Sequence, residues 1–183
     1  MRRLAGLVLC AVVLSGCRTG DGMDGGTDGG TGGGVDATAA LEAQREEVRG
    51  SAAGLVTGAV TALDGRPSNT AGGFEGCEST FNDQYKTFHY RANGRIDAGP
   101  AASRPYVEAL ATVLTDAGFG EPFAGERPGG QTLSAEKGEL SATFSELPGQ
   151  GDYVLLTVEG PCVEVPEDDR DSWLTRQDPS PYL

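Results

Sequence analysis

Glycine and aspartate dominate residues 18–36, and this composition limits where the chain can build a core. Nine of these 19 residues are glycine and four are aspartate, while Met23 and Val35 are the only sizeable apolar side chains. A segment that buries so little apolar surface cannot offset the conformational entropy lost on folding. We therefore expect a flexible linker over 17–36, with an end-to-end span of roughly 25 Å.

A short uncharged run with a basic start precedes this linker. Arg2 and Arg3 follow Met1, and the eleven residues 4–14 then carry no charge. A helix that crosses the hydrocarbon layer needs about 17 to 25 apolar residues, so this run is too short to remain as an anchor. Its length and its basic start are typical of a secretory leader. We predict a signal peptide over 1–16.

The end of the leader resembles the lipobox of bacterial lipoproteins. Residues 14–17 read Leu-Ser-Gly-Cys, a branched apolar residue and two small residues before a cysteine. The resemblance implies that the Cys17 thiol receives a diacylglyceryl group and that a dedicated peptidase cuts before it. Two or three acyl chains hold a protein on a bilayer, whereas one chain binds only marginally. We expect a lipid anchor on the extracytoplasmic face of the cell membrane; the alternative is an ordinary secretory signal with an incidental Cys17.

The charge balance excludes several classes of partner and protein. The chain has 14 Lys and Arg against 27 Asp and Glu, a formal net charge of −13, and no stretch gathers the basic residues into a patch. Such a charge repels phosphate backbones, so nucleic acid is not an expected partner. A length of 183 residues fits one modest domain and excludes a large multidomain enzyme.

Apolar periodicity places a compact domain over 37–166. Apolar residues spaced three, four and seven apart predict a helix over 37–63. Ser103 and Pro105 open a second helix, which Gly118 closes. Alternating or apolar runs predict strands over 73–79, 85–92, 132–136, 139–147 and 152–159.

The connections predict how these elements are arranged. Asn93-Gly94 predicts a tight turn that returns the chain through 95–98. Short links between strands favour antiparallel pairing. The order of elements predicts an α+β fold, an antiparallel sheet of four to five strands with two helices packed on one face. The acidic, proline-containing segment 167–183 is expected to be a frayed tail, with Trp173 and Leu174 as its candidates for docking.

Three glycines recur at every fourth residue of the first predicted helix. Gly50, Gly54 and Gly58 each cost up to about 1 kcal/mol relative to alanine in a helix. Close packing within the domain, a glycine-rich composition and pairing with a partner helix all fit this spacing.

Two cysteines remain for the folded domain once Cys10 leaves with the leader and Cys17 is lipidated. Two thiols outside the cytoplasm usually oxidise, so we predict a disulfide between Cys77 and Cys162. A zinc site is the alternative, but it would require about four Cys or His ligands at close spacing, and His89 is the only histidine in the sequence. We expect no metal and no cofactor.

No residue pattern identifies a reaction. Ser134 and Lys137 have the Ser-x-x-Lys spacing of penicillin-binding enzymes, but side chains three apart on a strand point to opposite faces. His89 has no Gly-x-Ser-x-Gly partner motif, and the pair Asp168-Asp169 lies in the predicted tail, where no pocket would separate two carboxyl pKa values. We therefore expect that the protein is not an enzyme.

The whole organisation resembles that of small actinobacterial cell-envelope lipoproteins of unknown function. The lipobox, the Gly/Asp linker, and Cys77 with the Gly-Pro-Cys at 160–162 around a compact domain carry the resemblance. A preference for arginine over lysine, twelve against two, fits a high-GC genome. The resemblance implies no activity and no site residues.

These observations predict a binding or interaction module at the cell envelope, held on the membrane through Cys17. Its partner would be a small-molecule ligand or an envelope protein. Tyr85, Thr87, His89 and Arg91 alternate onto the less apolar face of one strand and are the first candidate ligand surface. The simpler interpretation is that this face is the solvent side of the sheet. An envelope hydrolase with an atypical site is the alternative function, and a passive envelope component is a third.

Overall fold

The structure, a computed structural model, describes residues 33–77, 85–127, 130–147, 149 and 151–178. These residues all belong to one compact unit. The predicted signal peptide, Cys17 and most of the predicted linker lie outside the described residues. Among the described residues, no helix has both the length and the hydrophobicity that crossing a membrane requires.

The described chain is an antiparallel sheet with helices, which confirms the α+β class. The elements are α1 (Gly33–Ala62), β1 (Arg66–Gly76), β2 (Thr87–Asp97), α2 (Tyr106–Asp116), β3 (Phe123–Arg127), β4 (Gly130–Lys137), β5 (Leu140–Glu146), β6 (Tyr153–Glu159), β7 (Val163–Glu164), the short 3-10 helix η1 (Glu167–Asp169), α3 (Arg170–Leu174) and β8 (Gln177–Asp178). The strand order is β3-β4-β5-β6-β2-β1-β8, and β7 pairs with β2 beside this path. The sheet thus has eight strands in the described residues, more than the four to five expected.

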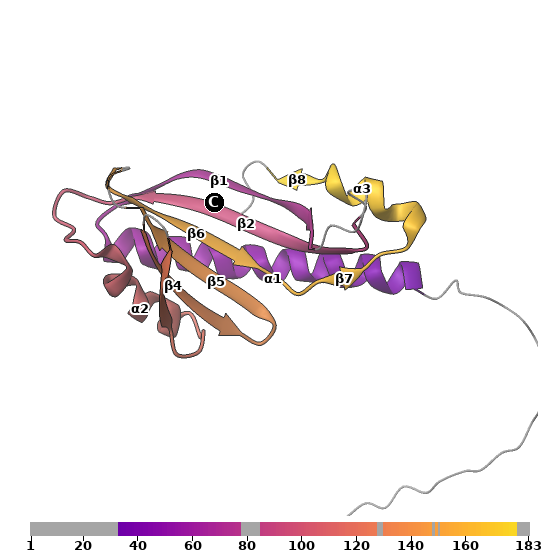
Figure 1. Ribbon diagram of the computed structural model, residues 1–183, viewed down its shortest axis with the longest axis horizontal. Coiled ribbons are helices and arrows are strands. Elements are labelled where there is room, and N and C mark those ends of the chain that lie inside the picture. The colour runs from indigo at the N-terminus through magenta and orange to yellow at the C-terminus, as the bar shows by residue number, and fades with distance from the viewer. Residues whose placement is uncertain (1–32, 78–84, 128–129, 148, 150, 179–183) are drawn as a thin grey trace, which may run out of the picture. The chain divides into compact units, whose positions relative to one another are not determined.

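Alternation along β2 explains how the sheet and the helices form separate layers. Buried and half-buried residues alternate over the whole strand. Phe88, Tyr90 and Ile96 are fully buried and point toward α1, whereas Thr87 and His89 point to the opposite face. α1 runs along β2 and β6, and α2 packs on β4 and β5 (Figure 1). The buried residues of α1 are Ala37, Leu41, Gln44, Val48, Ala52, Leu55, Val56 and Ala59, and Leu63 directly after the helix is buried as well.

The predicted turn at Asn93-Gly94 is wrong. β2 continues through both residues to Asp97, with Asn93 opposite Thr157 of β6 and Gly94 opposite Leu156. A two-residue hairpin turn of this type would need positive φ at both positions, and neither residue has it. β1 and β6 both pair with β2 here, so ladder hydrogen bonds on both edges outweigh the local turn preference.

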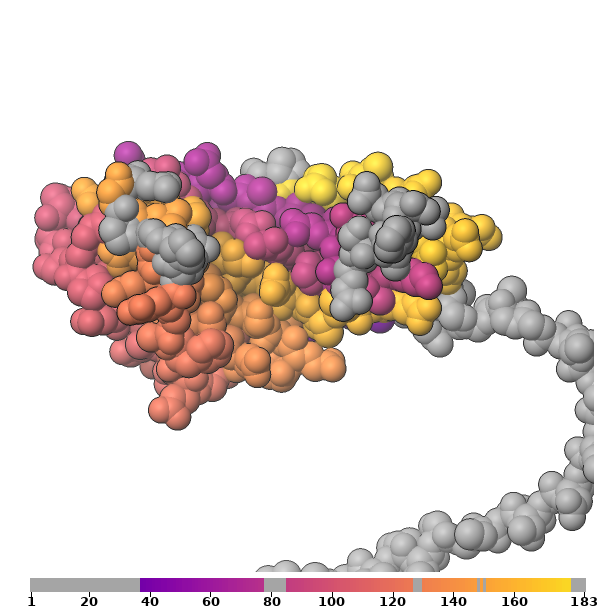
Figure 2. All heavy atoms as spheres, viewed as in Figure 1, coloured from indigo at the N-terminus to yellow at the C-terminus, as the bar shows by residue number. Residues whose placement is uncertain are grey.

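The expectation of a frayed tail over 167–183 is also wrong for residues 167–178, the part that the structure describes. Residues 167–178 form η1, α3 and β8, and β8 pairs with β1. Trp173 is buried and its ring packs edge-on against Phe74 with the centroids 4.6 Å apart, while Leu174 remains exposed. Figure 2 shows these C-terminal residues, in yellow, lying against the purple strand β1.

One carboxylate ties this C-terminal segment to both layers. Asp178 accepts hydrogen bonds from Arg45 Nε at 2.7 Å, from Arg45 Nη2 at 2.8 Å and from the Tyr90 hydroxyl at 2.7 Å. The Arg45 guanidinium lowers the pKa of Asp178 to about 2, and burial raises the pKa of Tyr90. The ionised form of Asp178 therefore joins β8 to α1 and to β2.

Replacing Asp178 by asparagine tests this tie. The pKa of Asp178 is lower in the folded chain than in the unfolded chain, where it is near 4. The carboxylate therefore stabilises the fold fully at a pH above about 4, and this contribution is lost as the pH falls through about 2. We expect Asp178→Asn to lower the free energy of unfolding by about 1 to 2 kcal/mol near pH 7. Urea denaturation of both proteins between about pH 7 and pH 2 measures this. A deficit that stays constant over that range would contradict the assignment.

Candidate functional site

The face of the sheet opposite α1 and α2 holds a hollow, which we call the open-face hollow. Its volume is about 430 Å³. β1, β2, β5 and β6 supply its lining: Asn69, Arg91, Asn93, Gly94, Arg95, Ser145, Tyr153, Leu155, Leu156 and Thr157. Two guanidinium groups, two amides, two hydroxyls and a phenol ring thus gather on one face.

Strand register explains why these residues meet. Asn93 lies opposite Thr157 and Arg95 lies opposite Leu155, so alternate residues of β2 and β6 share this face. Asn69 reaches the hollow from β1, where the register shifts between Ser68 and Ala71 and Asn69 has a φ of 48°. Such a bulge bends the strand and redirects a side chain.

Each arginine in the hollow already has acidic neighbours. Arg91 Nη1 donates to Glu75 at 3.1 Å, and Arg91 Nε lies 3.8 Å from Glu159. That Nε is buried and makes no hydrogen bond within the described part of the chain. Arg95 Nη2 lies 2.6 Å from Asp97 Oδ1. Because a carboxylate lies within 4 Å of each guanidinium, the hollow has little excess positive charge for attracting an anion.

The remaining groups supply contacts that suit a polar ligand. The Arg95 guanidinium stacks on the Tyr153 ring at 3.9 Å from its centroid. The Thr157 hydroxyl donates to the Asn93 side-chain oxygen at 3.1 Å. The hollow thus offers hydrogen-bond donors and acceptors on a paired sheet, while the Tyr153 ring beneath Arg95 is buried.

The structure does not bring the four residues of the predicted ligand surface together. Arg91 lines the open-face hollow, whereas Thr87 lies toward the other end of β2, opposite Glu164. Tyr85 lies on the other side, where its ring packs near Phe88 at a centroid distance of 6.4 Å and lines a separate hollow with η1 and α3. Of the four residues, Arg91 alone lines the open-face hollow.

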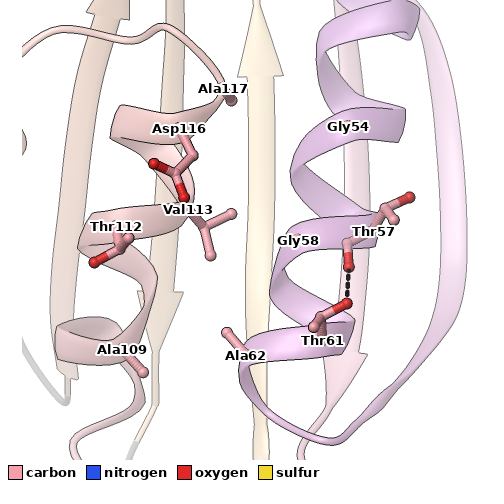
Figure 3. A pocket seen from close by; sticks show the side chains of 10 residues that line it. All are labelled: Gly54, Thr57, Gly58, Thr61, Ala62, Ala109, Thr112, Val113, Asp116 and Ala117. Carbon is pink, nitrogen blue, oxygen red and sulfur yellow. Dashed lines mark hydrogen bonds between the residues drawn. The ribbon is translucent and has the colours of Figure 1, made fainter.

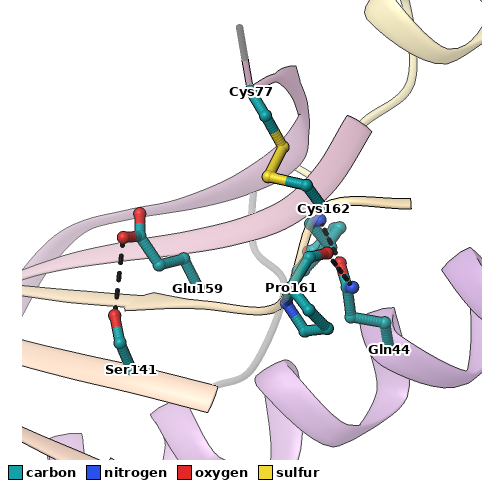
Figure 4. The surroundings of a disulfide bond; sticks show 7 residues. Gln44, Cys77, Ser141, Glu159, Pro161 and Cys162 are labelled. Atoms are coloured by element: carbon teal, nitrogen blue, oxygen red, sulfur yellow. Dashed lines mark hydrogen bonds between the residues drawn. A yellow bond between two sulfur atoms is a disulfide. The ribbon is translucent and has the colours of Figure 1, made fainter. Parts of the chain in front are cut away.

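His89 lies at a different place, beside the predicted disulfide. The structure contains the Cys77–Cys162 bond, which joins the residue after β1 to the loop between β6 and β7 (Figure 4). The buried side chain of Gln44 holds that loop, because its amide nitrogen donates to the Pro161 carbonyl at 2.7 Å. The same side chain accepts from the backbone N–H of Tyr90. The two cysteines are 85 positions apart in the sequence. A disulfide that closes a loop of this length stabilises a fold by about 4 to 5 kcal/mol in the chain-entropy model.

The Ser-x-x-Lys pattern does not form a catalytic pair. Ser134 Oγ hydrogen-bonds Thr143 Oγ1 at 2.9 Å, whereas Lys137 Nζ donates to the Ala117 carbonyl at 3.1 Å. The two side chains therefore have separate structural partners.

A second hollow lies between α1 and α2, and the repeated glycines contribute to it. Its volume is about 540 Å³, and glycine, alanine and threonine make up most of its lining, with Gly54 and Gly58 on α1 and Val113 on α2 (Figure 3). Gly58 packs closely against α2, because a Cβ added there would lie 2.7 Å from Val113 Cγ1. A Cβ added at Gly50 or Gly54 would meet no described atom within 4 Å. Close packing within the domain therefore accounts for Gly58 but not for the other two.

Comparisons with known proteins identify no family for this chain. No family model and no curated protein matches it. Among solved structures, the crystal structure of the candidate lipoprotein LppA from Mycobacterium tuberculosis superposes with a TM-score of 0.42 at 12% sequence identity, covering 78% of this chain and 85% of that one. Similarity at this level carries no conclusion about function.

Alanine substitutions in α1 test the two glycine environments against each other. We expect Gly54→Ala to raise the free energy of unfolding by up to about 1 kcal/mol, because alanine is the better helix former and the added methyl group meets open space. Gly58→Ala should lower it, because the stiff Val113 side chain must move. Thermal and urea unfolding of the two variants measure the difference. Equal effects at the two positions would contradict this account.

Proposed function

We propose that this protein is a lipid-anchored module on the extracytoplasmic face of the cell membrane that binds a small polar ligand in the open-face hollow. The observation that carries the binding proposal is the gathering of Arg91, Asn93, Arg95, Tyr153 and Thr157 on the sheet face opposite the helices. These side chains come from strands whose backbones are fixed by pairing, so the site is held in place before a ligand arrives.

The chemistry of the hollow favours an uncharged, hydroxyl-rich ligand such as a saccharide. The carboxylates beside Arg91 and Arg95 offset the attraction that two guanidinium groups would exert on an anion. Amide, hydroxyl and guanidinium groups can instead donate to and accept from ligand hydroxyls. The Arg95 guanidinium stacks on the Tyr153 ring, which holds its N–H donors in place for ligand hydroxyls.

Two observations support the proposed location, one from the sequence and one from the structure. The leader and the Leu-Ser-Gly-Cys at 14–17 favour export and lipidation at Cys17. The disulfide between Cys77 and Cys162 fits an oxidising compartment, where such bonds persist.

His89, the base that the alternative hydrolase would use, has its imidazole within 4.8 Å of both sulfur atoms of this disulfide.

Ligand binding is tested with the full chain carrying Cys17→Ser, which removes the lipid. Titration with soluble chito- and cello-oligosaccharides, followed by NMR, should shift backbone signals of β2 and β6 around Asn93 and Thr157. Asn93→Ala should weaken the affinity by about tenfold or more, since a ligand hydroxyl would lose its hydrogen-bond partner on the protein.

Arg66→Gln is the matched control, because Arg66 is an exposed arginine on β1 that is not part of the hollow. It should leave the affinity unchanged. Saccharide binding that does not respond to Asn93→Ala, or an absence of shifts around the hollow with every saccharide, would reject this ligand class.

Anchoring is tested by the mass and the distribution of the protein in its native host. The mature chain should begin at Cys17 and carry the added mass of at least two acyl chains. Cys17→Ser should move the protein from the membrane fraction to the soluble extracytoplasmic fraction. An uncleaved leader, or a chain that starts at residue 17 without lipid mass, would overturn the anchor.

A further inference from the structure

Three side chains that the sequence separates widely converge at one end of the open face. The sulfur atoms of Cys77 and Cys162 and a ring nitrogen of His89 all lie within 4.8 Å of one another. Cys77 follows β1, His89 lies in β2, and Cys162 precedes β7. Two sulfurs and one imidazole are the ligand types that bind zinc and other thiophilic cations in proteins.

The backbone around this cluster is fixed by contacts that do not depend on the disulfide. Cys77 N donates to the Thr87 carbonyl at 3.0 Å, and Gly76 pairs with Phe88. On the other side, Gln44 holds the Pro161 carbonyl, and β7 pairs with β2 directly after Cys162. The two cysteines therefore remain close to His89 when the bond between them is open.

We propose that Cys77, Cys162 and His89 form a binding site for a thiophilic d10 cation such as Zn²⁺ when the disulfide is reduced. In the oxidised chain the sulfurs are bonded to each other and cannot act as thiolates. A dithiol reductant transfers two electrons and two protons to the Cys77–Cys162 bond, which breaks to give two thiols while the reductant becomes a disulfide. The cation then displaces the two thiol protons and binds the two thiolates and the neutral imidazole, with water as its fourth ligand.

The exposure and the charge of the surroundings suit this role. Cys162 is exposed, and Cys77 and His89 are half-buried, so a reductant and a cation can reach the cluster. Glu75 lies opposite His89 on β1, and Glu164 lies opposite Thr87 on β7. The nearest basic group on the strand, Arg91, is paired with Glu75 and Glu159. Within the part of the chain that the structure describes, no hydrogen bond or ion pair engages the His89 imidazole.

Zinc titration of the oxidised and the reduced chain tests the proposal. The full chain carries Cys10→Ser and Cys17→Ser, so that Cys77 and Cys162 are its remaining thiols. We expect the chain reduced with a phosphine to bind a single Zn²⁺ that slows alkylation of both thiols and raises the melting temperature. The oxidised chain should bind none, and Mg²⁺ should not replace Zn²⁺, because it prefers oxygen ligands.

Variants on β2 separate a built site from two thiols alone. His89→Asn should weaken zinc binding to the reduced chain by about tenfold or more, since one of three protein ligands is lost. Thr87→Ala, two residues away on the same strand, should leave the affinity unchanged. Circular dichroism of each reduced chain, with and without Zn²⁺, shows whether the fold is kept.

Two results would overturn the proposal. The first is a reduced chain that binds Zn²⁺ equally well with and without His89. The second is a reduced chain that unfolds and regains no structure when Zn²⁺ is added. Neither result bears on the open-face hollow or on the anchor, which do not require these thiols.

Discussion

Burial of one side of β2 beneath α1 is the constraint on which the rest of the molecule depends. Phe88, Tyr90 and Ile96 are fully buried in that layer. A shift of one residue in register would turn the opposite face of β2 toward α1, which would place the Arg91 and Arg95 guanidinium groups in an apolar core. The same alternation therefore fixes the hydrophobic layer, the open-face hollow and the position of His89 beside the disulfide.

Buried and half-buried polar side chains connect this layer to segments that are distant in the sequence. Gln44 of α1 joins β2 to the loop before Cys162, and Arg45, the next residue, joins α1 to Asp178. Glu146 of β5 is buried and accepts from Arg104 and from the backbone N–H of Tyr106, so it satisfies the first turn of α2. Each of these groups has a partner in another element, which makes the arrangement of elements specific as well as stable.

The sequence was sufficient to predict the elements whose patterns are local. Periodicity located α1, α2, β4, β5 and β6, and the redox argument predicted the disulfide. The missed strands have no such pattern: β3 is an edge strand that pairs only with β4 in the described sheet and leaves Phe123 exposed, and β7 and β8 are two residues each. Their strand conformation comes from neighbours that are remote in the chain, which no local pattern encodes.

The candidate site was predictable only in part for the same reason. Alternation along one strand identified Arg91, but reading Asn93-Gly94 as a turn concealed Arg95, which continues the same row. Tyr153 and Thr157 required the register between β2 and β6, and Asn69 required a bulge in β1. Tyr85 follows the alternation in sequence yet packs on the Phe88 side, because Gly76 leaves room for its ring there.

The position of α1 as the first described element has a mechanical consequence. A pull transmitted through the residues before Gly33 enters the domain through this helix and is resisted by its side-chain packing on β2 and by the Arg45–Asp178 pair. The covalent loop between Cys77 and Cys162 encloses β2 to β6, so detachment of α1 would leave the two ends of this segment joined. A force applied at this end would load the contacts of α1 with the sheet first, and would reach the hydrogen bonds between the strands only through those contacts.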